Sequence, residues 1–208
     1  VLDLKIDDVT YSYINESWDN LTMVYIPDAM YQNESVTKAE VTADKSAVIK
    51  LDDGEENKVE IKGNGSAADK VTVERRTSDK KAEVKLPSGT KAKVFGHEVD
   101  TAPAGGVTVG QRSAVDTKYP DRDYIVIAVA GEKVTVDGIE YVATENNQKF
   151  YLGTFKAIVT IGSNAEITSG QKQTDVGYLK TYTVKISPKA DYDLDQDNFM
   201  VTMKESDT

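Results

Sequence analysis

The stretch KVTVDGIEYVA, residues 133–143, decides the fold class. Its apolar residues alternate with polar ones, and Asp137-Gly138 is a pair that favours a two-residue type I′ turn between antiparallel strands. Pairing Val134 with Tyr141 places the four apolar side chains of both strands on one face. A shift by one residue would expose them. The stretch therefore predicts a β-hairpin with one buried face.

The same alternation, rich in Val, Ile, Thr and Tyr, recurs along most of the chain, and it is the pattern of half-buried strands. Residues 66–81 are the one serious candidate for a helix, but Val71 and Val73 fit a strand better. We expect an all-β protein made of one or two Ig-like or jelly-roll-type antiparallel β-sandwiches. Further alternating pairs are Val59 and Ile61, Val84 and Leu86, Val107 and Val109, and Val184 and Ile186.

Two more turns have the residues of hairpin connections. Asp53-Gly54 predicts a hairpin that joins residues 48–51 to residues 59–61. Pro87-Ser88-Gly89 predicts another that joins residues 84–86 to residues 92–95. Glycines 105 and 106 predict a turn that leads into a strand, because no Lys-Ser or Lys-Thr pair follows them as a phosphate-binding loop requires.

The domain organisation is predicted from one apolar run and one polar stretch. Residues 124–129 are apolar on both faces, which is typical of a central strand. Before them, residues 111–123 lack alternation and could form a linker. We place a boundary near residue 115, with residues 1–115 as the first β-sandwich half or domain and residues 116–208 as the second.

The composition indicates an acidic, cysteine-free protein of the cell exterior. The 208 residues have a net charge of −10 and no cysteine, which excludes disulfides, thiolate nucleophiles and zinc ribbons. The longest apolar run, residues 124–130, is far too short for a transmembrane helix. Because the chain begins with Val1 and not with Met, we expect a processed or excised chain whose targeting segment lies upstream.

Charge is distributed unevenly along the chain. Residues 1–61 carry 14 acidic and 5 basic groups, whereas residues 62–100 carry 6 and 9. Residues 191–208 are again acidic, with 6 acidic groups and 1 basic group. Such a distribution favours head-to-tail association, although it also suits two solvated acidic surfaces. Nucleic acid is not an expected partner, because no basic cluster interleaved with aromatics stands clear of acidic residues.

Four sequence motifs for N-glycosylation lie in the first third of the chain. This density predicts N-linked glycans on an exposed face of a secreted protein, and the alternative is a set of asparagine-rich turns. The acceptors are Asn15, Asn20, Asn33 and Asn64.

Four aspartates alternate near the end of the chain and could supply about half of the oxygen ligands of a calcium ion. The segment is not an EF-hand, since Gln196 stands where that loop needs glycine. The alternative is a solvated acidic loop before a terminal strand at residues 199–203. The candidate ligands are Asp191, Asp193, Asp195 and Asp197.

We do not expect an enzyme. His97 is the only histidine, so a Ser-His-Asp triad or a histidine-ligated metal would have to use it, and no serine lies in a G-x-S-x-G motif. A pair of carboxylates of the glycosidase kind is possible among 35 acidic residues, but the sequence indicates none in particular.

With these four glycosylation motifs, no cysteine and runs such as YLKTYTVKI at residues 178–186, the chain resembles archaeal surface-layer and extracellular filament proteins. The resemblance implies subunits that repeat in a lattice or filament, often with calcium and glycans. We expect self-assembly by β-strand addition, with an N-terminal donor strand. Its apolar residues would be Val1, Leu2, Leu4 and Ile6.

Two other functions remain open. Five aromatic residues, including Trp18, lie in the first 31 positions, and exposed aromatics could stack on sugars in a carbohydrate-binding or adhesin module. An accessory β-domain of a secreted glycoside hydrolase is the second alternative.

Overall fold

The computed structural model describes residues 2–6, 9–13, 21–25, 38–44, 46–51, 54–76, 78–79, 81–193 and 202–203. These residues form β-sheets that are antiparallel except for one parallel pair and that pack as sandwich-like layers, and their only helical element is the short 3-10 turn η1, Glu55–Asn57. The predicted all-β class is therefore confirmed. No helix in these residues is long and apolar enough to cross a membrane.

The chain divides into two compact units, Val1–Tyr151 and Leu152–Thr208. The first unit contains an eight-stranded sheet, in the order β15-β12-β11-β8-β7-β4-β1-β2, and a seven-stranded sheet, in the order β14-β13-β10-β9-β6-β5-β3. Its strands are β1 Leu2–Ile6, β2 Val9–Tyr13, β3 Leu21–Tyr25, β4 Lys38–Ala43, β5 Ser46–Lys50, β6 Lys58–Lys62, β7 Ser66–Arg75, β8 Ala82–Leu86, β9 Lys91–Val94, β10 His97–Val99, β11 Val107–Gly110, β12 Tyr124–Ile127, β13 Lys133–Val136, β14 Ile139–Val142 and β15 Gln148–Tyr151.

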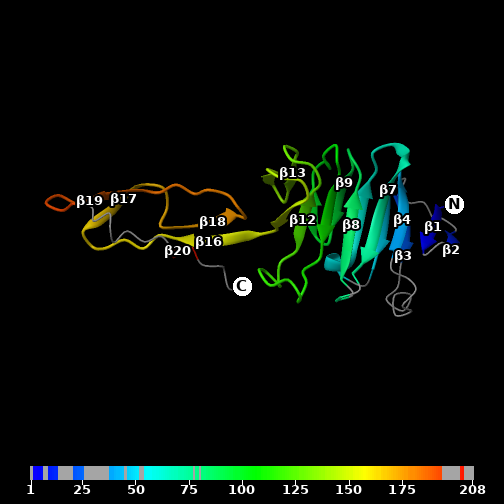
Figure 1. Ribbon diagram of the computed structural model, residues 1–208, viewed down its shortest axis with the longest axis horizontal. Coiled ribbons are helices and arrows are strands. Elements are labelled where there is room, and N and C mark those ends of the chain that lie inside the picture. Colours follow the sequence, from blue (N-terminus) through cyan, green and yellow to red (C-terminus); the bar gives the residue numbers. More distant parts are fainter. Residues whose placement is uncertain are drawn as a thin grey trace. The chain divides into compact units, whose positions relative to one another are not determined.

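After β1, β2 and β3, which belong to no repeat, the first unit consists of three tandem repeats of four strands, β4 to β7, β8 to β11 and β12 to β15. In each repeat the two outer strands pair in the eight-stranded sheet and the two inner strands form a hairpin in the seven-stranded sheet. Each repeat then pairs with the next one in both sheets. The strands therefore follow one another across the sheets in chain order, as the colours in Figure 1 show.

Equivalent corners of the second and third repeats have the same hydrogen bonds. The N–H of Gly89 donates to the carbonyl oxygen of Ala102 over 2.9 Å, and the N–H of Gly131 donates to that of Ala143 over 2.8 Å. Each alanine N–H returns a bond to the residue after the glycine. Both glycines have positive φ, 76° and 85°, which other residues rarely adopt. The repeats are thus alike in backbone detail.

The hairpin turns repeat in the same way. Asp137 and Gly138 have φ values of 51° and 78°, and Phe95 and Gly96 have values of 54° and 87°. Two consecutive residues with positive φ form a type I′ turn. Val134 pairs with Tyr141, so the predicted register of residues 133–143 is confirmed.

The core lies between the two sheets. One row of paired residues crosses the eight-stranded sheet through Val73, Val84, Val109, Ile125 and Phe150, and all five are buried. The matching buried residues of the seven-stranded sheet are Ala47, Ile61, Ala92, Val99 and Val136. Alternation of period two places these residues inward and their polar neighbours outward.

Of the other predicted hairpins, the structure contains one and not the other. β5 pairs with β6, as predicted from Asp53-Gly54. The hairpin predicted at Pro87-Ser88-Gly89 is wrong, because β8 lies in the eight-stranded sheet and β9 in the seven-stranded sheet. The turn carries the chain from one sheet to the other.

The division between the units lies after Tyr151 and not near residue 115. The strands on either side of residues 111–123 pair with each other, β11 with β12, so this stretch connects neighbours in one sheet and is not a linker. Its Gln111 and Ser113 are buried. β12, predicted as the core of the second half, belongs to the first unit.

The connectivity differs from the expected Ig-like or jelly-roll arrangement. Greek-key sandwiches return a strand across the sheet by a long connection. Here the strands of the three repeats follow one another in chain order, and each repeat packs against the one before it. The sandwich is therefore a linear array.

The second unit has a three-stranded sheet, β18-β16-β20, and a two-stranded ribbon, β17-β19. Its strands are β16 Thr154–Ile158, β17 Ala165–Ser169, β18 Gln173–Gly177, β19 Lys185–Pro188 and β20 Thr202–Met203. Phe155 and Val176 pair in the three-stranded sheet and are buried.

Candidate functional site

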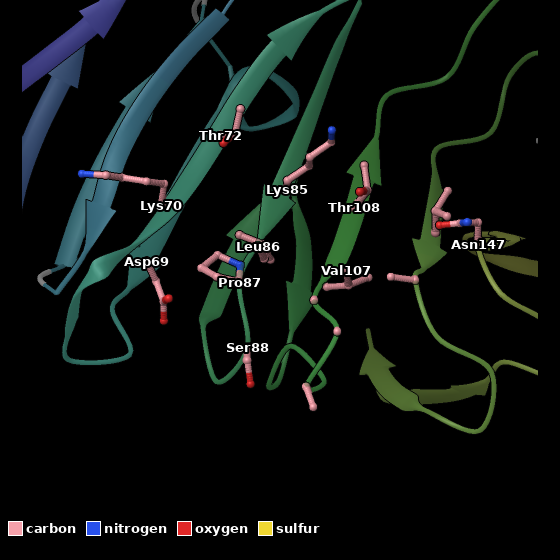
Figure 2. A pocket seen from close by; sticks show the side chains of 15 residues that line it. Asp69, Lys70, Thr72, Lys85, Leu86, Pro87, Ser88, Val107, Thr108 and Asn147 are labelled. Carbon is pink, nitrogen blue, oxygen red and sulfur yellow. The ribbon is translucent and has the colours of Figure 1, made fainter.

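A groove of about 540 Å³ crosses the outer face of the eight-stranded sheet. Thr72, Lys85 and Thr108 lie side by side on β7, β8 and β11, as Figure 2 shows. Sequence reasoning did not find this groove, because only the strand register brings its residues together. Its lining residues are Asp69, Lys70, Thr72, Lys85, Leu86, Pro87, Ser88, Ala104, Gly105, Gly106, Val107, Thr108, Val126, Ala128 and Asn147.

The charged residues that line the groove are one aspartate and two lysines. The Oδ2 atom of Asp69 accepts a hydrogen bond from the side-chain amide of Asn64 over 2.8 Å. Lys70 and Lys85 are the basic residues of the groove, and Lys85 pairs in register with two threonines. Ammonium groups beside hydroxyl groups can bind the carboxylate and hydroxyl groups of an acidic sugar.

Glycines form the floor of the groove near the corner of the sandwich. A Cβ atom at Gly106 would lie 2.8 Å from the carbonyl oxygen of Leu86, and one at Gly105 would lie 2.6 Å from Cγ2 of Val129. The predicted turn before β11 is confirmed. Only glycine allows the chain to approach so closely there.

Within the described part of the chain, the sandwich has open edges at both ends of the array. β14 and β15 end the two sheets on one side, and β2 and β3 end them on the other. Each of these strands pairs with one neighbour among the described residues. An edge strand has unpaired backbone groups that can bind a further strand.

The predicted donor strand is already paired. Leu2, Leu4 and Ile6 lie in β1, which pairs with β2 on one side and with β4 on the other. Val1 is outside the described residues. As far as the described strands go, β2, and not β1, has an open edge.

Of the four predicted glycosylation sites, only Asn64 is among the described residues. Its side-chain oxygen accepts a bond from the N–H of Ser66, and its nitrogen donates to Asp69 and to the carbonyl oxygen of Ser88. A glycan replaces one of the two hydrogens on this nitrogen, so at least one of the last two bonds would be lost. Asn15, Asn20 and Asn33 lie outside the described residues, and glycosylation of all four sites stays a prediction.

The predicted calcium ligands are also only partly described. Asp191 and Asp193 are exposed in the loop after β19, and Asp195 and Asp197 lie outside the described residues. Among the residues that the structure describes, no acidic or histidine cluster has the arrangement of a metal site. Calcium binding stays a prediction.

His97 connects two neighbouring repeats. Its Nδ1 lies 2.6 Å from Oδ2 of Asp137 in the turn of the third repeat, and its Nε2 lies 2.9 Å from Oδ2 of Asp123. Burial opposes protonation, but the hydrogen bonds and charges of the two carboxylates outweigh it and raise the pKa of His97. The two carboxylates bind opposite edges of the imidazole ring and do not point toward a common ligand. We call His97 with Asp123 and Asp137 the clamp.

We expect the clamp to make stability depend on pH. A raised pKa means that the protonated imidazole stabilises the folded chain fully below its unfolded pKa, about 6.5, and that this stabilisation is lost as pH rises through the folded pKa. His97→Gln should cost about 1 kcal/mol or more at low pH and less at high pH. Thermal unfolding of both proteins from about pH 6 to about pH 9 measures this. If the unfolding temperatures of the two proteins change with pH in parallel, the clamp does not contribute to the pH dependence and the prediction is wrong.

Searches against protein-family models, curated proteins and solved structures found no match to this chain.

Proposed function

We propose that the protein is a non-catalytic, extracellular structural subunit that assembles with copies of itself into a filament or surface lattice by β-strand addition. The observation that carries the proposal is the open-ended array of repeats in the first unit. Inside the chain, the edge strands of one repeat are covered by the next repeat. The terminal edges have the same unpaired backbone groups. Calcium and N-linked glycans belong to the proposal through the predicted ligands and acceptors.

Proline substitutions at the open edges test the proposal. In a two-residue hairpin the residues that flank the turn are hydrogen-bonded, and alternate residues point their N–H outward. The N–H groups of Ser12 in β2 and Val142 in β14 therefore point to the open edges. Ser12→Pro or Val142→Pro, or both, should abolish assembly while changing monomer stability by no more than about 1 kcal/mol.

Two matched substitutions keep the N–H and serve as controls. Ser12→Ala and Val142→Thr should assemble as the unmodified protein does, as measured by sedimentation velocity. Assembly that is unchanged in both proline variants would rule out strand addition at these edges.

A second candidate function, the binding of acidic carbohydrate, is favoured by the groove of Figure 2. Lys85 lies between two threonines in its centre. Lys85→Glu should weaken binding of an acidic oligosaccharide by about tenfold or more, because a charge-assisted hydrogen bond is replaced by repulsion. Lys81→Glu, at an exposed position outside the groove, is the control. Equal affinities of Lys85→Glu and Lys81→Glu for the acidic oligosaccharide, or no binding by the unmodified protein, would contradict this function.

A further inference from the structure

The second unit contains a ribbon, β17 with β19, whose apolar residues are only partly buried by the residues that the structure describes. Between residues 160 and 193 only Val176 is buried. Ile167 and Ile186 face each other across β17 and β19, and both remain partly exposed. A two-stranded ribbon without a covering layer is marginally stable in water. The ribbon therefore has an apolar face that requires a partner.

The two outer edges of the ribbon are not equivalent. Among the described residues, β17 and β19 pair only with each other. β19 ends at Pro188, which has no N–H to donate, whereas β17 contains no proline. β17 is a strand of five residues, and so is β2 at the open edge of the sandwich. The free edge of β17 can therefore form a ladder with an edge strand of that length.

Charge indicates which edge strand the ribbon fits. Residues 152–190 carry five lysines and two carboxylates. None of these lysines has an ion pair with the described residues. Residues 1–61, which contain β2, carry 14 acidic and 5 basic groups. Opposite net charges steer and orient such an encounter. The lysines are Lys156, Lys172, Lys180, Lys185 and Lys189.

From these observations we infer that the ribbon of one copy docks on the open β2 edge of the sandwich in a second copy, whose first 61 residues are acidic in sum, with β17 adding to β2. The inference rests on the proposed function and names its interface. The contact is heterologous, since one copy gives the ribbon and the next gives the edge, and repetition produces a chain of subunits.

The absence of cysteine allows a direct test in the full-length chain. One variant carries Ser169→Cys in β17, and another, with a size tag, carries Ser12→Cys in β2. They are mixed and treated with a flexible bis-maleimide that spans a five-residue strand, about 17 Å. The yield of cross-linked dimer between Ser169→Cys and Ser12→Cys should be about ten times the yield between Ser169→Cys and Thr144→Cys. Thr144 lies at the opposite end of the array from β2 and is therefore the control.

A charge reversal provides the second readout. Lys172→Glu with Lys185→Glu should reduce the mixed product to the level of the Thr144→Cys control, whereas Lys81→Glu should leave it unchanged. Equal yields with both partners would overturn the inference, as would a cross-link that forms only within one chain carrying both cysteines. If polymers form but this cross-link does not, the inferred interface is wrong and the proposed function stands. If neither polymers nor the cross-link form, the proposed function is contradicted as well.

Discussion

Replacing Ile125 by alanine is expected to lower the free energy of unfolding of the first unit by about 2–5 kcal/mol. Ile125 is fully buried in β12 and lies between Val109 of the second repeat and Phe150 of the third. Truncation removes apolar contacts with both repeats and leaves a cavity where they meet. Denaturant unfolding followed by circular dichroism measures the loss.

Ile139→Ala is the matched control, because it deletes the same atoms from a partly exposed position in the edge strand β14. Ile139→Ala should lower the free energy of unfolding by about 1 kcal/mol, because folding removes less apolar surface from water at this position. Equal costs for the two substitutions would mean that the buried row through Ile125 does not hold the repeats together.

Gly110→Ala should destabilise the same unit by about 1–3 kcal/mol or more. A Cβ atom at this position would overlap Cζ of Tyr124, and the ring cannot move away easily. Its hydroxyl donates to Glu83 and accepts a bond from Nη1 of Arg76 over 3.0 Å. Arg76 is itself held by two bonds to Asp79. Thermal unfolding of the variant measures the cost.

A double-mutant cycle separates this clash from other effects of the methyl group. In a Tyr124→Ala background the same Gly110→Ala change should cost close to nothing, because the ring is gone. A cost that is the same in both backgrounds would show that the ring is not the obstacle.

Hairpins with their own tight turn could be predicted from the sequence, and the assignment of strands to the two sheets could not. Residues 133–143 contain their own turn, so their register follows from alternation alone. Residues 84–86 and 92–95 alternate just as clearly, yet they belong to different sheets. That outcome depends on the corner at Gly89 and its bond to Ala102, which the local pattern does not contain.

The repeat is visible in the sequence as a shared pattern, which is less obvious than the alternation of apolar and polar residues. Residues 91–98 and residues 133–140 share the pattern K-x-x-V-x-G-x-E. A comparison of the chain with itself could have detected it. The partners of His97 had no such signal, because the two aspartates lie 26 and 40 residues away along the chain.

The central claim is that the open array of repeats makes this chain an assembling subunit. Electron microscopy of the purified, unmodified protein over a range of concentrations, with calcium and with a chelator, tests it most directly. The account predicts ordered fibres or sheets, with Ser12→Pro or Val142→Pro preventing them. A monodisperse monomer at every concentration, with and without calcium, would contradict it.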